Sequence, residues 1–249
     1  MDSGKASSGV LAEALSTLRP GPADRHGPLA PMMLALTFVT GLVDATSYLR
    51  LGHVFVANMT GNVVFLGFGL AGAAGISVLS SLVAIAAFVI GAGLGGALAG
   101  RSSAHRGRRL RAACAAQALL IALALIVSLI ASSPLATAAR YELIVPLAMA
   151  MGVQNATAQT LAIPELTTTV LTKTLTGIAS EAGLLGGPGA QFGRRSVAVA
   201  TMLAGALAGG LLVLDVSVAA SLGLAGALVV CVGAAAHMLG RGDPGWTRT

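Results

Sequence analysis

The chain has 249 residues, of which 55% are hydrophobic and 10% are charged, and its mean hydropathy is +0.86. Soluble domains carry roughly 25% charged residues, so this composition excludes an ordinary soluble protein and predicts an integral membrane protein whose partner is the lipid bilayer. The net charge of +6 does not indicate nucleic-acid binding, because the arginines lie in short connections between apolar segments, where they set membrane topology.

Residues 1–28 are polar and rich in proline, glycine and serine, which predicts a disordered cytoplasmic tail. The apolar segments that follow cover residues 30–49, 54–74, 77–99, 112–131, 141–160, 165–186, 196–214 and 217–239. The final residues, 241–249, are polar again and form a second short tail. With 33 glycines and few aromatic residues, the helices are expected to pack closely through small side chains. A homo-oligomer formed through the Gly-rich helices is a further partner to consider.

Two of the apolar segments are poor membrane spans. Segment 54–74 opens with Asn58, Thr60 and Asn62, and segment 165–186 carries Glu165, Lys173 and several threonines. Neither segment can face lipid on all sides. Both segments are therefore predicted to be re-entrant or broken helices. Non-helical backbone at membrane depth is tolerated only when it is buried against protein.

The arginines distinguish two topologies. If all eight segments cross and the N-terminal tail is inside, the basic segment 101–111 ("RSSAHRGRRLR") falls outside, against the positive-inside rule. If segments 54–74 and 165–186 each return to the side from which they enter, the basic connections and both termini are cytoplasmic. The sequence therefore predicts an all-α protein with six membrane crossings and two broken elements, in a bacterial inner membrane.

An internal repeat divides the membrane region. "GLVDAT" (41–46) recurs as "GVQNAT" (152–157), and "VAIAAFVIGAGLGGAL" (83–98) aligns with "VAVATMLAGALAGGLL" (197–212). Between these blocks, Thr60 falls on Thr172. We therefore predict a first repeat over 29–131 and a second over 132–240. Three crossings per repeat invert one repeat relative to the other, an arrangement that recurs in secondary transporters.

The stretch "GLVDATSYLRLGHVFVANMTGNVVFLG" resembles the YoaK-like family of bacterial polytopic membrane proteins, a domain of unknown function. The resemblance rests on the aspartate phrase, on Phe55 and the run Asn58 to Asn62, and on "MGVQNA" (151–156). It implies an inner-membrane protein without an established activity or cofactor. Lys173 departs from the pattern, because the family has glycine at this position of "LTGTL".

Asp44 is the candidate site residue with the largest energetic cost. A carboxylate at the centre of a membrane helix costs roughly 2.5–3.5 kcal/mol on insertion scales. Thr37, Thr40, Asp44 and Ser47 share one helix face, which predicts that this face lines the bundle interior or water. Two interpretations remain open. Asp44 binds a cation, a proton or substrate, or it is a structural carboxylate that accepts hydrogen bonds from the broken element.

The remaining polar candidates also have two interpretations. Asn58, Thr60 and Asn62 precede an apolar half-helix, where free N–H groups bind polar ligands or are capped by these side chains. Gln154 and Asn155 are their counterparts near the end of the fifth segment, with an amide in place of the Asp44 carboxylate. Lys173 pairs with Asp44 if it is buried, or extends to the membrane surface.

The predicted function is a transporter or channel for a small solute or ion, with its path between the two repeats. The alternative is a non-transporting membrane protein such as an assembly partner or sensor. The sequence contains no nucleophile elbow, zinc motif or phosphate-binding loop, so we expect no enzyme activity, metal or cofactor. The predicted pathway residues are Asp44, Ser47, Tyr48, Asn58, Thr60, Asn62, Gln154, Asn155 and Thr172.

Overall fold

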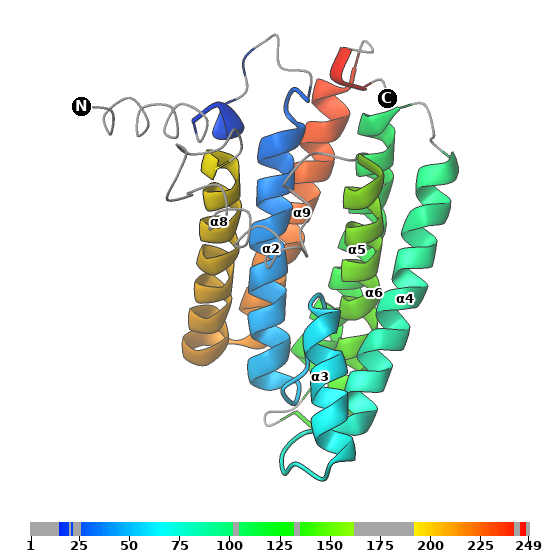
Figure 1. Cartoon of the computed structure of the whole chain (residues 1–249), viewed down its shortest axis with the longest axis vertical. Helices are drawn as coiled ribbons and strands as arrows, with labels where there is room; N and C mark the ends of the chain where they lie inside the picture. Colours follow the sequence, from blue (N-terminus) through cyan, green and yellow to red (C-terminus); the bar gives the residue numbers. More distant parts are fainter. Residues whose placement is uncertain are drawn as a thin grey trace, which may run out of the picture.

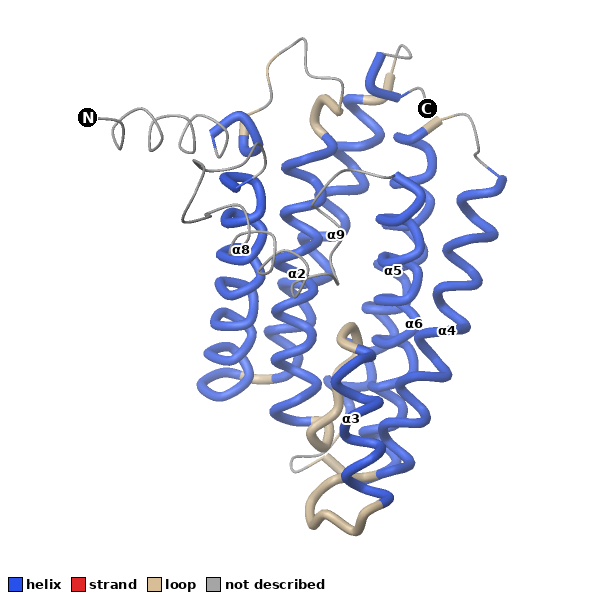
Figure 2. The backbone as a smooth tube through the Cα atoms, in the orientation of Figure 1, coloured by secondary structure: helices blue, strands red, loops and turns tan. Residues whose placement is uncertain are grey.

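The computed structural model describes residues 15–19, 21, 26–101, 105–131, 135–161, 192–241 and 245–247. Figure 1 shows a bundle of long helices that lie side by side, and Figure 2 shows the loops that join them. The helices are α2 (Leu29–Arg50), α3 (Met59–Leu70), α4 (Val78–Arg101), α5 (Arg106–Ile130), α6 (Thr137–Leu161), α8 (Phe192–Leu211), the π-helical turn η1 (Leu212–Val216), α9 (Val218–Leu239) and the 3-10 turn η2 (Gly245–Thr247).

Five of the described helices are long and apolar enough to cross a membrane: α2, α4, α5, α8 continued by η1, and α9. With 22 to 25 residues each, they rise at least about 30 Å at 1.5 Å per residue, the thickness of the hydrocarbon core. Helix α6 is as long but more polar, and most of its second half is buried in the bundle. The prediction of a helical membrane protein is therefore confirmed.

The predicted broken element at 54–74 has a half-helix at its core. After α2 ends, residues 54–58 rise back into the bundle, and α3 then runs down toward the end from which α4 starts (Figure 1). Helix α3 has 12 residues, so it is about 18 Å long and too short to span a membrane. The chain therefore enters and leaves this element at the same end of the bundle.

A sharp reversal at the end of α2 makes this return possible. Gly52 and His53 both adopt positive φ, at 96° and 57°. The backbone N–H of His53 donates to the carbonyl of Tyr48 (3.2 Å), a contact typical of a helix that ends in a left-handed turn. At the other end of the loop, the Asn58 side chain caps α3 by accepting from the N–H of Gly61 (3.3 Å).

The basic segment was predicted to lie between helices, but its residues 106–111 form the beginning of α5, which starts at Arg106 instead of 112. The His105 ring caps this end by accepting from the Arg108 N–H (3.2 Å). The side chain of Arg106 donates to the carbonyl of Leu161 (2.9 Å), at the last turn of α6. Cations are favourable at a helix C-terminus and unfavourable at an N-terminus, so Arg106 stabilises the end of α6 at some cost to the start of its own helix, α5.

The described segments nearest the two termini, residues 15–19 and 245–247, lie at the same end of the bundle (Figure 1). Within the predicted disordered tail, residues 15–18 form a turn of helix and Thr17 is buried. Trp246 in η2 packs against Gly27, where an added Cβ would lie 2.9 Å from the Trp246 side chain. The C-terminal turn therefore covers the start of α2.

Helices α4 and α6 pack backbone to backbone. A Cβ added at Gly91 would collide with the carbonyl oxygen of Met149, and one at Gly95 would lie 2.8 Å from the carbonyl oxygen of Val153. From the opposite side, a Cβ at Gly152 would collide with the backbone of α4. Only glycine allows this approach, as in the small-residue interfaces of membrane helices.

Helices α2 and α8 pack in the same manner. A Cβ added at Gly205 would collide with the carbonyl oxygen of Phe38, and one at Gly209 would lie against Leu42. A Cβ at Gly41 would collide with the backbone of α8. The first helix of each predicted repeat therefore packs against the second crossing of the other repeat.

The two sets of contacts correspond residue by residue. Gly41 of α2 corresponds to Gly152 of α6. The two contact glycines of α4 correspond to those of α8, Gly91 to Gly205 and Gly95 to Gly209. Helices α2 and α6 run in opposite directions, as do α4 and α8, and α5 and α9 (Figure 1). The predicted element 165–186, with Thr172 and Lys173, lies outside the described residues.

We expect Gly91→Ala to destabilise the protein by roughly 1–3 kcal/mol, because the methyl group forces α4 away from α6. The matched control is Gly93→Ala, two residues along the same helix, where an added Cβ meets nothing within 4 Å. Thermal unfolding of the purified variants measures the difference. Equal midpoints for the two variants would contradict the close α4–α6 contact.

Candidate functional site

A cavity of about 650 Å³ lies among α2, α3, α4, α6 and α8. Its polar groups come from α2, from the start of α3 and from α6, so both predicted repeats contribute. Apolar side chains from α3, α4 and α8 complete the wall. The lining residues are Thr40, Asp44, Ala57, Asn58, Met59, Thr60, Gly61, Val64, Phe65, Phe88, Asn155, Gln159 and Met202.

The carboxylate of Asp44 joins this cavity to the broken element. Asp44 is 5% exposed, and its Oδ1 accepts hydrogen bonds from the backbone N–H groups of Val56 (3.0 Å) and Ala57 (2.8 Å). These N–H groups belong to a non-helical loop inside the bundle, where an unpaired donor is costly. Asp44 therefore has the structural role predicted as one of its two interpretations, that of a carboxylate that accepts hydrogen bonds from the broken element.

This role does not use the whole carboxylate. The hydrogen bonds from Val56 and Ala57 end on Oδ1 and the backbone N–H of Asn58 also interacts with the carboxylate, whereas an ionised carboxylate has about four acceptor positions over two oxygens. Asp44 also lies on the cavity wall, with Asn58, Thr60 and Asn155 around the same space. The structural and the ligand-binding interpretations of Asp44 are therefore compatible in this geometry.

Asn62 is a structural residue. Its side chain is fully buried and forms two hydrogen bonds with the backbone of one residue, because Nδ2 donates to the carbonyl of Phe55 (2.6 Å) and Oδ1 accepts from the N–H of Phe55 (2.9 Å). Asn62 does not line the cavity. Its pairing holds the loop 54–58 against the first turn of α3.

Tyr48 and Ser47 also lie away from the cavity. The Tyr48 ring stacks on Phe55 with centroids 5.1 Å apart and meets His53 edge to face at 5.2 Å, which fixes the reversed loop through aromatic contacts. The Ser47 hydroxyl donates to the backbone carbonyl of Asp44 (3.1 Å). Both residues support the site without bordering it.

Gln154 forms a buried network behind the cavity. Its Oε1 accepts from Gln117 of α5 (2.6 Å), and its Nε2 donates to the hydroxyl of Thr40 (2.7 Å) and to the carbonyl of Leu36 (3.2 Å). The network joins α2, α5 and α6, and Thr40 carries it to the cavity wall. Gln154 therefore positions cavity residues and is not a lining residue itself.

Asn155 lines the cavity from α6 and donates to the carbonyl of Met151 (3.0 Å). One turn further along α6, the exposed side chain of Gln159 borders the same cavity. Sequence reasoning missed Gln159, although its spacing of four residues from Asn155 places both on one helix face. The sequence signal that could have identified Gln159 is a polar side chain near the end of the apolar segment 141–160.

The sequence-predicted residues thus fall into three groups. Asp44, Asn58, Thr60 and Asn155 meet at the cavity, while Ser47, Tyr48, Asn62 and Gln154 hold the surrounding backbone. Thr172 lies outside the described residues. The described part of the chain holds no cluster of three or more metal-ligating side chains. One carboxylate among amides and hydroxyls suits a proton, a monovalent cation or a small polar molecule.

Helices of transmembrane length around a cavity that holds polar side chains define a polytopic helical membrane protein. The family model "protein of unknown function (DUF1275)" matches residues 32–235, and the chain belongs to this family. The chain is similar to the UPF0700 transmembrane protein YoaK of Bacillus subtilis (strain 168), with 32% identity over 151 residues. The match covers 60% of this chain and 65% of that protein. The resemblance drawn from the aspartate phrase is confirmed, and no solved structure matches.

We expect Asn62→Ala to lower stability more than Asn58→Ala. The first change leaves the buried N–H and carbonyl of Phe55 without partners, at roughly 1–3 kcal/mol for each unsatisfied group. The second removes one exposed helix cap, at about 1 kcal/mol. Thermal unfolding, with proteolysis of loop 51–58 as a local probe, measures both. Equal losses would show that Asn62 does not hold the loop.

Proposed function

We propose that this protein is a transporter or channel for a small solute or ion, whose path passes the Asp44 cavity between two inverted repeats. The observation that carries the proposal is a buried carboxylate that borders a polar cavity and also binds the backbone of a broken membrane element. Ionisable residues inside membrane bundles characteristically mark substrate and ion pathways. In this proposal the protein catalyses no reaction and requires no cofactor.

Two observations support the inverted repeats. The glycine contacts between α2 and α8 match those between α4 and α6 at corresponding positions, and the corresponding helices run in opposite directions. We propose that α6 is the sixth crossing and that 165–186 is the second broken element. Thr172 would then face Thr60 across the pseudo-two-fold axis, as in transporters with discontinuous helices near the midplane.

The charge distribution supports cytoplasmic termini in a bacterial inner membrane. The end of the bundle that holds residues 15–19 and 245–247 also holds the basic ends of four helices (Figure 1). The opposite end carries two arginines, Arg50 and Arg140, together with two acidic residues, Glu142 and Asp215, so its described charges balance. Cytoplasmic connections are enriched in lysine and arginine. The basic residues are Arg101, Arg106, Arg108, Arg109, Arg111, Arg194, Arg195 and Arg241.

Asp44 connects ligand binding to the shape of the broken element. Hydrogen bonds from N–H groups to an ionised carboxylate are stronger than those to a neutral acid. A proton or cation at Asp44 therefore weakens its contacts with Val56 and Ala57. The loop would shift at Val56 and Ala57 in response, while the pairing of Asn62 with Phe55 keeps the start of the loop in place. Occupancy of the cavity thereby controls access to it.

We expect Asp44→Asn to fold and to lose the response to ions and pH. The Asn side-chain oxygen accepts the same two backbone hydrogen bonds, so the loop keeps its anchor while the charge is lost. Asp44→Ala removes the anchor as well and should cost roughly 1–3 kcal/mol for each unpaired N–H. The measurements are the thermal midpoint against pH, Na⁺ and K⁺, and proton or cation flux into proteoliposomes.

Thr37→Ala is the matched control, because Thr37 is buried on the same helix, lies off the cavity and donates to the carbonyl of Met33, one turn before it. It should keep the ion and pH response of the native protein. If folded Asp44→Asn also keeps that response and the flux, Asp44 is only structural. The proposal would then give way to a non-transporting membrane protein.

A further inference from the structure

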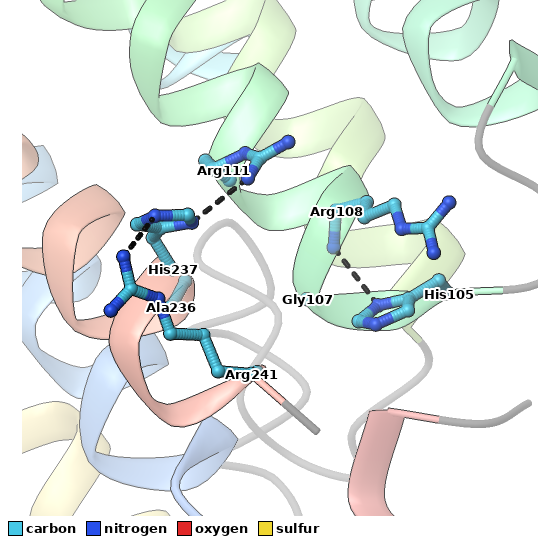
Figure 3. A pocket seen from close by; sticks show the side chains of 8 residues that line it. His105, Gly107, Arg108, Arg111, Ala236, His237 and Arg241 are labelled. Carbon is cyan, nitrogen blue, oxygen red and sulfur yellow. Dashed lines mark hydrogen bonds between the residues drawn. The ribbon is translucent and has the colours of Figure 1, made fainter. Parts of the chain in front are cut away.

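A second pocket, of about 360 Å³, lies at the end of the bundle that holds residues 15–19 and 245–247. It is formed by the first turns of α5 and the end of α9, as Figure 3 shows. Five of its lining side chains are basic or imidazole groups. We call it the basic pocket, and these residues are His105, Arg108, Arg111, His237 and Arg241.

Two guanidinium groups flank one imidazole ring in this pocket (Figure 3). A terminal nitrogen of Arg111 lies 2.9 Å from Nδ1 of His237, and a terminal nitrogen of Arg241 lies 3.3 Å from its Nε2. A neutral imidazole has one acceptor nitrogen and one N–H donor, whereas a guanidinium only donates. At most one of the two contacts is therefore a hydrogen bond, and the other brings two donors together.

The pocket also lacks a compensating negative charge in the described part of the chain. The described carboxylates are Asp44 at the cavity and Glu142 and Asp215 at the opposite end of the bundle. None of these three carboxylates lines the basic pocket or pairs with one of its arginines. The positive-inside rule accounts for arginines at this end. This rule does not explain why three arginines, from α5 and from the end of α9, line the same pocket.

We propose that the basic pocket binds a phosphate group, either of an anionic lipid headgroup or of free phosphate. Phosphate oxygens accept from the planar guanidinium fork, and they supply the acceptor that His237 cannot offer to both arginines. Trp246 lies beside the pocket, with its ring 3.2 Å from the position of a Cβ at Gly107. Tryptophan is enriched at the depth of lipid headgroups. This inference is independent of the transport proposal.

The test uses the full chain, purified in neutral detergent and freed of lipid. One arm titrates inorganic phosphate at constant ionic strength and follows the thermal midpoint. The other arm compares nanodiscs of phosphatidylglycerol with nanodiscs of phosphatidylcholine. Each arm is repeated with Arg111→Gln, with Arg241→Gln and with the control Arg101→Gln, an exposed arginine at the same end of the bundle that does not line the pocket.

We expect saturable stabilisation that weakens roughly ten- to hundredfold in each pocket variant and is unchanged in Arg101→Gln. A response to inorganic phosphate identifies free phosphate as sufficient, and a response to phosphatidylglycerol alone identifies a lipid headgroup. If Arg111→Gln does not fold, Arg241→Gln tests the same pocket from α9. Absence of stabilisation in both arms, or equal stabilisation of all variants, would overturn the proposal.

Discussion

The structure depends on the hydrogen bonds that the Asp44 carboxylate accepts from Val56 and Ala57. A loop that re-enters a membrane bundle carries N–H and carbonyl groups that water cannot reach, and each unpaired group is costly. Asp44 pairs two of these groups, Asn62 pairs two more, and the Tyr48 ring packs the reversal in between. The broken element and the cavity beside it exist because these contacts satisfy the backbone.

Close helix packing places this element correctly. Glycines at Gly41 and Gly205 let α2 and α8 touch along their backbones, and Gly91 and Gly152 do the same for α4 and α6. Lipid provides no hydrophobic drive for helices to associate, so such van der Waals contacts supply much of the specificity. Because the tight pairs use glycine, the larger polar side chains are left to border the space between the pairs.

Hydropathy predicted the long helices to within a few residues, and charge predicted that 54–74 returns to the end it enters. The start of α5 was missed because a run of arginines reads as a loop, although arginine is a good helix former. Periodicity placed Asp44 and Ser47 on one face but did not reveal that the cavity lies closer to Asp44. Contacts between distant segments, such as Asn62 with Phe55 or Gln154 with Gln117, leave no periodic signal.

Water should reach the polar cavity beside Asp44, and cysteine labelling in nanodiscs tests this access most directly. Thr60 lines the cavity, whereas Val63, three residues along α3, is also exposed but lies outside it. In a cysteine-free background, Thr60→Cys should react with a charged thiol reagent, and Val63→Cys, facing lipid, should not. Reaction of Val63→Cys at the same rate, or no reaction of Thr60→Cys, would contradict a water-accessible site at this carboxylate.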